Sequence, residues 1–179
     1  NETYFNSSFN ITIKWRAGDN NDVIKQYIVL DDSINITVTG NNYTFKNISE
    51  GRHEIKIFVK DLAGNIVYML VVIYVDLSPP TIQIESPKNH SYILSKRFEV
   101  ILAVNDNIAL DYIKVSMDGT LQHTINQSTR IVIKTTEGKH VIEIEAYDKG
   151  GNKSSARIYV EVIAEKIQII LVISIVVCA

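Results

Sequence analysis

The side chains best suited to chemistry in this chain are its four histidines, because histidine changes charge near neutral pH. His53 and His140 each follow a glycine by two positions and occupy the same place in two copies of one motif. A catalytic histidine is not expected to be duplicated in this way. We therefore interpret both as structural corner residues. His90 and His123 stand among polar residues and are expected to be solvated.

A second possible chemistry is calcium binding through carboxylate and amide oxygens. The candidate ligands are Asp106, Asn107 and Asp111, with Asp76 joining them from a neighbouring segment. The alternative is ordinary turn chemistry, since Asp and Asn are common in turns for their local hydrogen bonds. Both interpretations stay open.

Other catalytic arrangements are missing from the sequence. There is one cysteine, Cys178, and neither Cys-x-x-Cys nor His-Glu-x-x-His occurs, so zinc has no support. Gly150-Gly151 does not precede a helical pattern, which argues against a phosphate loop. The net charge of −2 gives no electrostatic footprint for nucleic acid. We expect a protein without enzymatic activity and without a cofactor.

The elements that position the histidines form a repeat. Residues 51–65 and 138–152 share Gly, His, Ile, Ile, Asp, Gly and Asn at one offset, 138 − 51 = 87. Strict alternation of apolar and polar residues predicts a half-buried strand in each copy. Asp-x-x-Gly-Asn then predicts a turn with positive φ at Gly64 and Gly151, followed by a closing strand. The predicted core is Ile11, Ile13, Trp15, Ile55, Ile57 and Ile73 in copy one, and Val100, Leu102, Ile142, Ile144 and Val160 in copy two.

These motifs resemble the bacterial and archaeal immunoglobulin-like (Big-type) repeat domains of cell-surface proteins. The resemblance rests on the Gly-x-His strand, the Asp-x-x-Gly-Asn turn and the Val-x-Val closing strand. Residues 77–87, 106–110 and 117–119 add to it. It implies an all-β fold with two tandem immunoglobulin-like β-sandwich domains, at residues 1–76 and 77–164. It says little about function, because this sandwich hosts many roles.

The first domain is expected to lack its first strand. Asn1-Glu2-Thr3-Tyr4 aligns with Asn89-His90-Ser91-Tyr92, and copy one has no counterpart of the predicted strand at residues 81–84. We interpret the chain as cut from a longer protein. The alternative is a naturally shortened first domain.

The end of the chain, residues 165–179, is expected to be a hydrophobic membrane anchor, helical and truncated. Residues 167–179 are apolar except for Gln168 and Ser174. This stretch is shorter than the roughly 20 residues of a full helical span. A buried extra strand is the alternative.

Asn-x-Ser/Thr sequons point to a secreted glycoprotein. Nine of the fifteen asparagines have this context. The serine and threonine content of the chain would give far fewer sequons by chance. A preference for Asn and Thr in β-turn regions is the rival explanation. The candidate glycosylation sites are Asn1, Asn6, Asn10, Asn35, Asn42, Asn47, Asn89, Asn126 and Asn152.

One apolar stripe is expected on the outward face of the first hairpin. If the hairpin closes tightly, Phe58 lies opposite Tyr68, in line with Leu70, Val72 and Tyr74. Exposed stripes of this kind mark contact surfaces, and a sheet edge beside one is open to strand addition. The alternative is cover by a loop or by the missing first strand.

The sequence therefore predicts a non-enzymatic extracellular surface module of a larger, glycosylated, membrane-anchored protein of bacteria or archaea. Its role would be that of a stalk, an adhesin or a part of envelope assembly. Its partners would be neighbouring immunoglobulin-like repeats, other surface proteins and, through the C-terminal segment, the membrane. The main alternative is a pair of accessory domains of a larger secreted or membrane-bound hydrolase. A carbohydrate-binding module would need a planar row of exposed aromatics, and no clear row is visible in the sequence.

Overall fold

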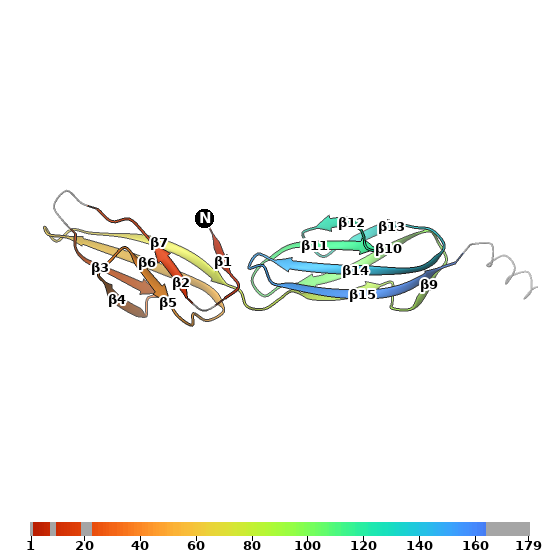
Figure 1. Ribbon diagram of the computed structural model, residues 1–179, viewed down its shortest axis with the longest axis horizontal. Coiled ribbons are helices and arrows are strands. Elements are labelled where there is room, and N and C mark those ends of the chain that lie inside the picture. Colours follow the sequence, from red (N-terminus) through yellow and green to blue (C-terminus); the bar gives the residue numbers. More distant parts are fainter. Residues whose placement is uncertain (1, 8–9, 19–22, 164–179) are drawn as a thin grey trace, which may run out of the picture. The chain divides into compact units, whose positions relative to one another are not determined.

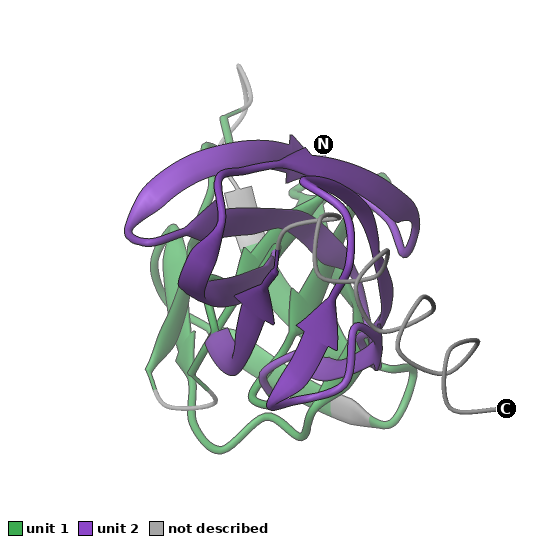
Figure 2. Ribbon diagram, turned by 90° about the vertical axis from the view of Figure 1, so that its right-hand side faces the viewer, with its two compact units in different colours: residues 1–78, 149–152 green, residues 79–148, 153–179 purple. Residues whose placement is uncertain are grey.

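The computed structural model describes residues 2–7, 10–18 and 23–163, and this part of the chain is entirely β-structure. Its strands are labelled in Figure 1. The chain divides into two compact units (Figure 2). Unit 1 comprises residues 1–78 and 149–152, and unit 2 comprises residues 79–148 and the chain from residue 153 onward.

Unit 1 contains a five-stranded sheet in the order β1-β7-β6-β3-β4 and a two-stranded sheet of β2 and β5. The strands are β1 (Thr3–Phe5), β2 (Ile11–Lys14), β3 (Val23–Leu30), β4 (Ile34–Val38), β5 (Asn42–Phe45), β6 (Gly51–Asp61) and β7 (Ile66–Val75).

Unit 2 contains a five-stranded sheet in the order β12-β11-β14-β15-β9 and a three-stranded sheet in the order β13-β10-β8. The strands are β8 (Thr81–Ser86), β9 (Ser91–Ile93), β10 (Arg97–Asn105), β11 (Leu110–Met117), β12 (Thr120–Ile125), β13 (Arg130–Lys134), β14 (Gly138–Asp148) and β15 (Lys153–Val162).

The core of each unit lies between its two sheets and follows from the alternation of β6 and β14. In β14 every second residue from His140 to Asp148 is buried, and Ile142 and Ile144 are fully enclosed. Ile55 and Ile57 of β6 do the same in unit 1. The predicted core is thereby confirmed, except that Ile13 is only half-buried against it.

The turns after β6 and β14 also form as predicted. Gly64 has φ +94° and Gly151 has φ +95°. In the first turn the backbone amide of Asp61 donates to the Asn65 carbonyl over 3.1 Å, and the Asn65 amide donates to the Asp61 carboxylate over 2.7 Å. The hairpin is therefore closed tightly, with Phe58 directly opposite Tyr68.

Two short strands were not predicted. β1 pairs in parallel with the end of β7, with Tyr4 beside Tyr74, and β9 pairs in parallel with the end of β15. Their three-residue length gives too little alternation to read from the sequence. Their equivalence agrees with the alignment of residues 1–4 with residues 89–92.

The predicted membrane anchor at residues 165–179, including Cys178, lies outside the described residues. Within the part of the chain that the structure does describe, no helix is long and apolar enough to cross a membrane.

Truncation of a central core residue should destabilise unit 2 strongly. Ile144 is 0% exposed, so Ile144→Ala removes buried methyl groups and leaves a cavity. We expect a loss of about 2–5 kcal/mol in the free energy of unfolding, measured by urea denaturation. Lys139→Ala, at an exposed position of the same strand, is the control and should stay within about 0.5 kcal/mol. A loss at Ile144 as small as the control's would refute the burial.

A side chain at Gly64 should strain the first turn. A Cβ at Gly64 meets no atom within 4 Å, so its positive φ is the only obstacle to substitution. Gly64→Val should therefore destabilise unit 1 by more than about 1 kcal/mol. Gly40→Val is the matched control, since Gly40 is equally open and lacks positive φ. Equal thermal stability of the two variants would contradict the strain argument.

Candidate interaction surface

The predicted apolar stripe lies on one face of β6 and β7, but its exposure is uneven. Tyr68 is 61% exposed and Leu70 is 47% exposed. Phe58, Val72 and Tyr74 are half-buried. Tyr74 stacks on Tyr4 with ring centroids 4.8 Å apart. The open part of the stripe is therefore formed by Tyr68 and Leu70, in the first half of β7 and away from β1, and we call this part the apolar strip.

Charged side chains of β6 flank the rest of the stripe. In the register of the two strands Lys56 lies opposite Leu70, Glu54 opposite Val72 and Arg52 opposite Tyr74. Arg52 and Glu54 form an ion pair of 2.7 Å. A partner would thus meet an apolar strip bordered by charges, a pattern in which the charges set orientation more than affinity.

Three aromatic side chains form a row across β3, β6 and β7, in which Tyr27 and Phe58 are half-buried and only Tyr68 is exposed. Tyr27 of β3 stacks on Phe58 with centroids 4.6 Å apart and an interplanar angle of 6°. Phe58 in turn lies 5.3 Å from Tyr68. Cross-strand pairing produces this row, which the sequence could not show without the register. The rings turn their faces to one another, so they do not present the flat platform that a carbohydrate-binding module needs.

The first half of β7 is also exposed on its other face. Val67 is 66% exposed and Met69 is 54% exposed, although both have the inward parity of the buried Ile73. Sequence reasoning missed these two residues as surface residues because their parity predicted burial. Five consecutive large apolar residues, from Ile66 to Leu70, are thus solvent-exposed.

The two corner histidines are fully engaged by structural hydrogen bonds. His53 Nδ1 lies 2.7 Å from Asp31 Oδ2, and its Nε2 lies 2.8 Å from the Ser49 carbonyl oxygen. The Glu54 amide donates to the other Asp31 oxygen over 2.9 Å. Both ring nitrogens face oxygen atoms, so neither is available as a general base. This geometry confirms a structural role.

Unit 2 repeats the same corner. His140 Nδ1 lies 2.7 Å from Asp118 Oδ2, and its Nε2 lies 3.0 Å from the Thr136 carbonyl oxygen. Burial acts to raise the pKa of Asp118, but hydrogen bonds from His140 and the Val141 amide, with the charge of His140, lower it overall. The net lowering means that the folded corner favours the Asp118 carboxylate.

The remaining histidines differ from one another. His90 is exposed and stacks on Tyr159 with centroids 5.7 Å apart. His123 is half-buried, and its Nε2 lies 3.3 Å from the Val132 carbonyl oxygen. His90 is thus solvated as predicted, and His123 is solvated only in part.

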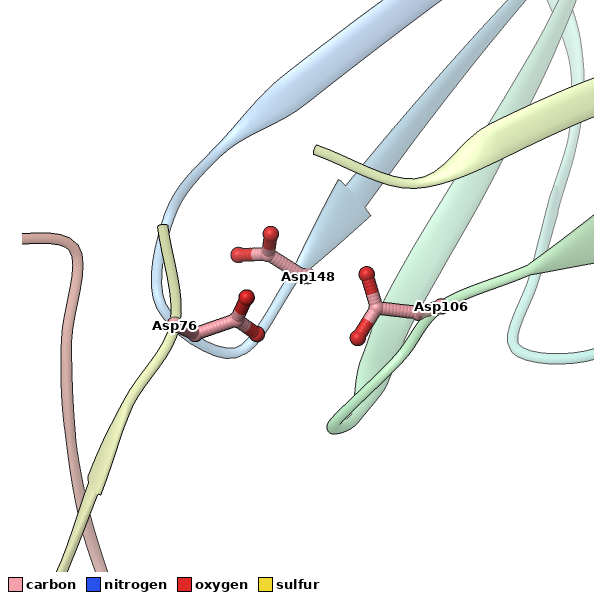
Figure 3. A group of neighbouring side chains, drawn as sticks. All are labelled: Asp76, Asp106 and Asp148. Atoms are coloured by element: carbon pink, nitrogen blue, oxygen red, sulfur yellow. The ribbon is translucent and has the colours of Figure 1, made fainter. Parts of the chain in front are cut away.

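Two carboxylates of unit 2, those of Asp106 and Asp148, lie near each other (Figure 3). Oxygen atoms of Asp106 and Asp148 lie within 4.8 Å of one another. Asp106 Oδ1 accepts hydrogen bonds from the amides of Ile108 (2.9 Å) and Ala109 (2.6 Å). Its Oδ2 is buried without a hydrogen-bond partner among the described residues. Sequence reasoning missed Asp148, although the buried alternation of β14 ends on it.

The calcium site suggested at Asp76, Asp106, Asn107 and Asp111 stays a prediction. Asn107 and Asp111 are exposed. Asp76, also drawn in Figure 3, belongs to unit 1, where it is fully buried and its amide donates to the Phe5 carbonyl over 2.8 Å. The two neighbouring carboxylates of Asp106 and Asp148 supply fewer oxygens than the roughly six to eight that calcium takes.

Most sequon asparagines have the exposure that a glycan requires. Asn152 is half-buried, and its side-chain amide donates to a backbone carbonyl over 2.8 Å. Asn1 lies outside the described residues. The exposed ones are Asn6, Asn10, Asn35, Asn42, Asn47, Asn89 and Asn126.

No family model and no curated protein sequence matches the chain. Solved structures do match it. The fibronectin(III)-like modules of Clostridium thermocellum CbhA share 16% identity at a TM-score of 0.53, over 92% of this chain and 90% of that chain. Extracellular domains 3–5 of Drosophila OTK share 12% identity at a TM-score of 0.51, over 92% of this chain and 58% of that chain.

At such low identity these similarities concern the fold alone. They define the protein's class as all-β with an immunoglobulin-like, fibronectin III-like fold. The narrower assignment to the Big-type repeats of bacteria and archaea stays a prediction.

The Asp118 corner should make the stability of unit 2 depend on acid pH. The pKa of Asp118 is lower in the folded state than its ordinary value of 3.8. The carboxylate therefore stabilises the fold above about pH 4, and this contribution is lost as the pH falls through the folded pKa. Asp118→Asn, which keeps the side-chain shape at φ 50°, should lower stability at pH 6 and flatten its decline between pH 5 and 3.

Thermal unfolding across this pH range would measure the effect. Asp111→Asn, at an exposed carboxylate, is the control and should follow the parent curve. An unchanged acid slope in Asp118→Asn would show that the corner carboxylate does not titrate with folding.

Proposed function

We propose that the chain is a non-enzymatic extracellular module, with two tandem immunoglobulin-like sandwiches forming part of a larger cell-surface protein. The single observation that carries this proposal is the exposed apolar strip on β7, where Tyr68 and Leu70 are about half-exposed or more. Soluble monomers rarely expose contiguous apolar surface without a use. The partner that fits it is another immunoglobulin-like domain.

The type of partner follows from the border of the strip. Ion-paired Arg52 and Glu54 on one side carry both signs of charge, so nucleic acid and strongly charged polymers are poor fits. A second sandwich offers a flat sheet face of mixed polarity. Packing of sheet on sheet buries such a strip while leaving the charged border at the rim.

Glycosylation and membrane attachment complete the proposal. Seven sequon asparagines are exposed on the described residues, which gives a glycosylating enzyme access to them. Attachment through residues 165–179 rests on their apolar sequence alone. Intact-mass analysis of the protein from its own cells tests the first element, because unmodified sequons would remove glycosylation from the proposal.

The hydrolase alternative places the same sandwiches beside a catalytic domain. Neither corner histidine is placed to act as a catalytic base for such a hydrolase, since both ring nitrogens of His53 and of His140 lie within hydrogen-bond distance of oxygen atoms. The complete reading frame separates the two functions: further repeats favour a stalk, and a catalytic domain favours the alternative.

A charge placed on the strip should abolish self-association. Leu70→Lys introduces an ammonium group at a position that is 47% exposed, which the monomer tolerates and an apolar interface does not. Multi-angle light scattering of the parent should give a mass that rises with concentration, and Leu70→Lys should lower it to the monomer value.

The matched control is Tyr159→Lys, at 48% exposure on β15. It should associate like the parent. A parent that stays monomeric, or an association that both variants reduce equally, would refute docking through the strip. Association unchanged in both variants would assign it to another part of the chain and likewise refute this proposal.

A further inference from the structure

The two units differ beside one pair of equivalent strands. β2 of unit 1 pairs with β5 as β10 of unit 2 pairs with β13: Ile11 lies opposite Phe45, and Val100 lies opposite Ile131. β10 also pairs on its other side with β8. In unit 1, no strand among the described residues pairs with the other side of β2.

β8 contributes to the structure of unit 2 in two ways. It pairs antiparallel with β10, with Ile84 opposite Leu102 and Ile82 opposite Val104, and both isoleucines pack against the core. Pro80, directly before β8, also lies against the start of β15, where the Ser154 hydroxyl donates to the Pro80 carbonyl over 2.5 Å. β8 thus closes one side of the sandwich.

The corresponding place in unit 1 is an open groove. It has a volume of about 250 Å³ and is lined by Trp15, Ile57, Val59, Val67 and Met69, among other residues. These residues come from the segment directly after β2 and from the inner faces of β6 and β7. Tyr68 also lines this groove, whereas Leu70 does not.

The inner face of β7, the closing strand of unit 1, is more exposed than the equivalent face of β15 in unit 2. At an offset of 87 residues, Val67 and Met69 correspond to Ser154 and Ala156. The unit 1 residues are 66% and 54% exposed, whereas Ser154 and Ala156 are half-buried. The larger and more apolar side chains are thus the more exposed ones, which is the reverse of what burial energetics favours.

We propose that this groove is a strand-binding site, occupied by an extended segment that pairs antiparallel with β2 and leads into β1. An unpaired strand edge supplies backbone hydrogen bonds, and apolar pockets at alternate positions select the side chains. The occupant carries two large aliphatic residues two positions apart, as Ile82 and Ile84 do in β8.

Geometry within unit 2 argues for a covalently joined strand. Only residues 87–90 separate β8 from β9, and β9 pairs with β15 as β1 pairs with β7. A strand in the groove would therefore end close to the start of β1. A four-residue connection suffices, and a joined strand binds without the entropy cost of a separate molecule.

The test adds the segment to the 179-residue chain. One protein carries a copy of Thr81–Lys88 (TIQIESPK) ahead of Asn1, so that its last two residues with Asn1 and Glu2 form the four-residue connection to β1, and the matched control carries the same eight residues with both isoleucines replaced by lysine (TKQKESPK). Hydrogen exchange of β2 and β7 is the measurement, and β10 and β15 are the internal reference. We expect exchange in β2 to slow at least about tenfold with the isoleucine segment and to stay unchanged with the lysine segment.

Trp15 gives a second readout, because it is the only tryptophan and lines the groove. Its emission should shift to shorter wavelength only with the isoleucine segment. Equal exchange and equal emission in the two extended proteins would overturn the proposal. Protection of the unextended chain by the free TIQIESPK peptide, as strong as that given by the extension, would overturn the assignment to a joined strand.

Discussion

Burial of the inner face of the long central strand, β6 in one unit and β14 in the other, is the constraint on which both units depend. Full burial of an isoleucine contributes about 1.5–3 kcal/mol, and Ile55, Ile57, Ile142 and Ile144 are all at most 2% exposed. Because a strand has period two, a one-residue slip would move all of them to solvent. The alternation therefore fixes the register of every strand that pairs with these two.

The histidine corner reinforces this register at the start of the same strand. In unit 1, Asp31 binds both the His53 ring and the Glu54 amide, which ties the turn after β3 to the beginning of β6. Asp118 does the same for His140 and Val141 in unit 2. Both aspartates have φ near +50°, a conformation that their short polar side chains tolerate. The corner thus gives the histidine near the start of each repeat a structural role.

The all-β fold, most strands and nearly all of the core could be predicted because alternation and turn chemistry are local properties. The short strands β1 and β9 could not, since three residues carry no usable period. The stacked Tyr27–Phe58–Tyr68 row and the Asp106–Asp148 pair join residues far apart in the chain. They depend on strand pairing, and pairing partners were known from the sequence only for the hairpins.

The two closing strands, β15 and β7, differ in the apolar content of their first halves, and this difference can be compared with how far each strand is covered. β15 begins with polar and small residues, Lys153 to Arg157, and alternates between exposed and half-buried positions. β7 begins with the unbroken apolar run Ile66 to Val72, a pattern typical of a strand that is covered on both faces. In unit 1 alone, both faces of its first half meet solvent. In the two proposals above, a strand in the inner groove covers Val67 and Met69, and a neighbouring domain covers Leu70 on the outward face, so together they would cover both faces of this run.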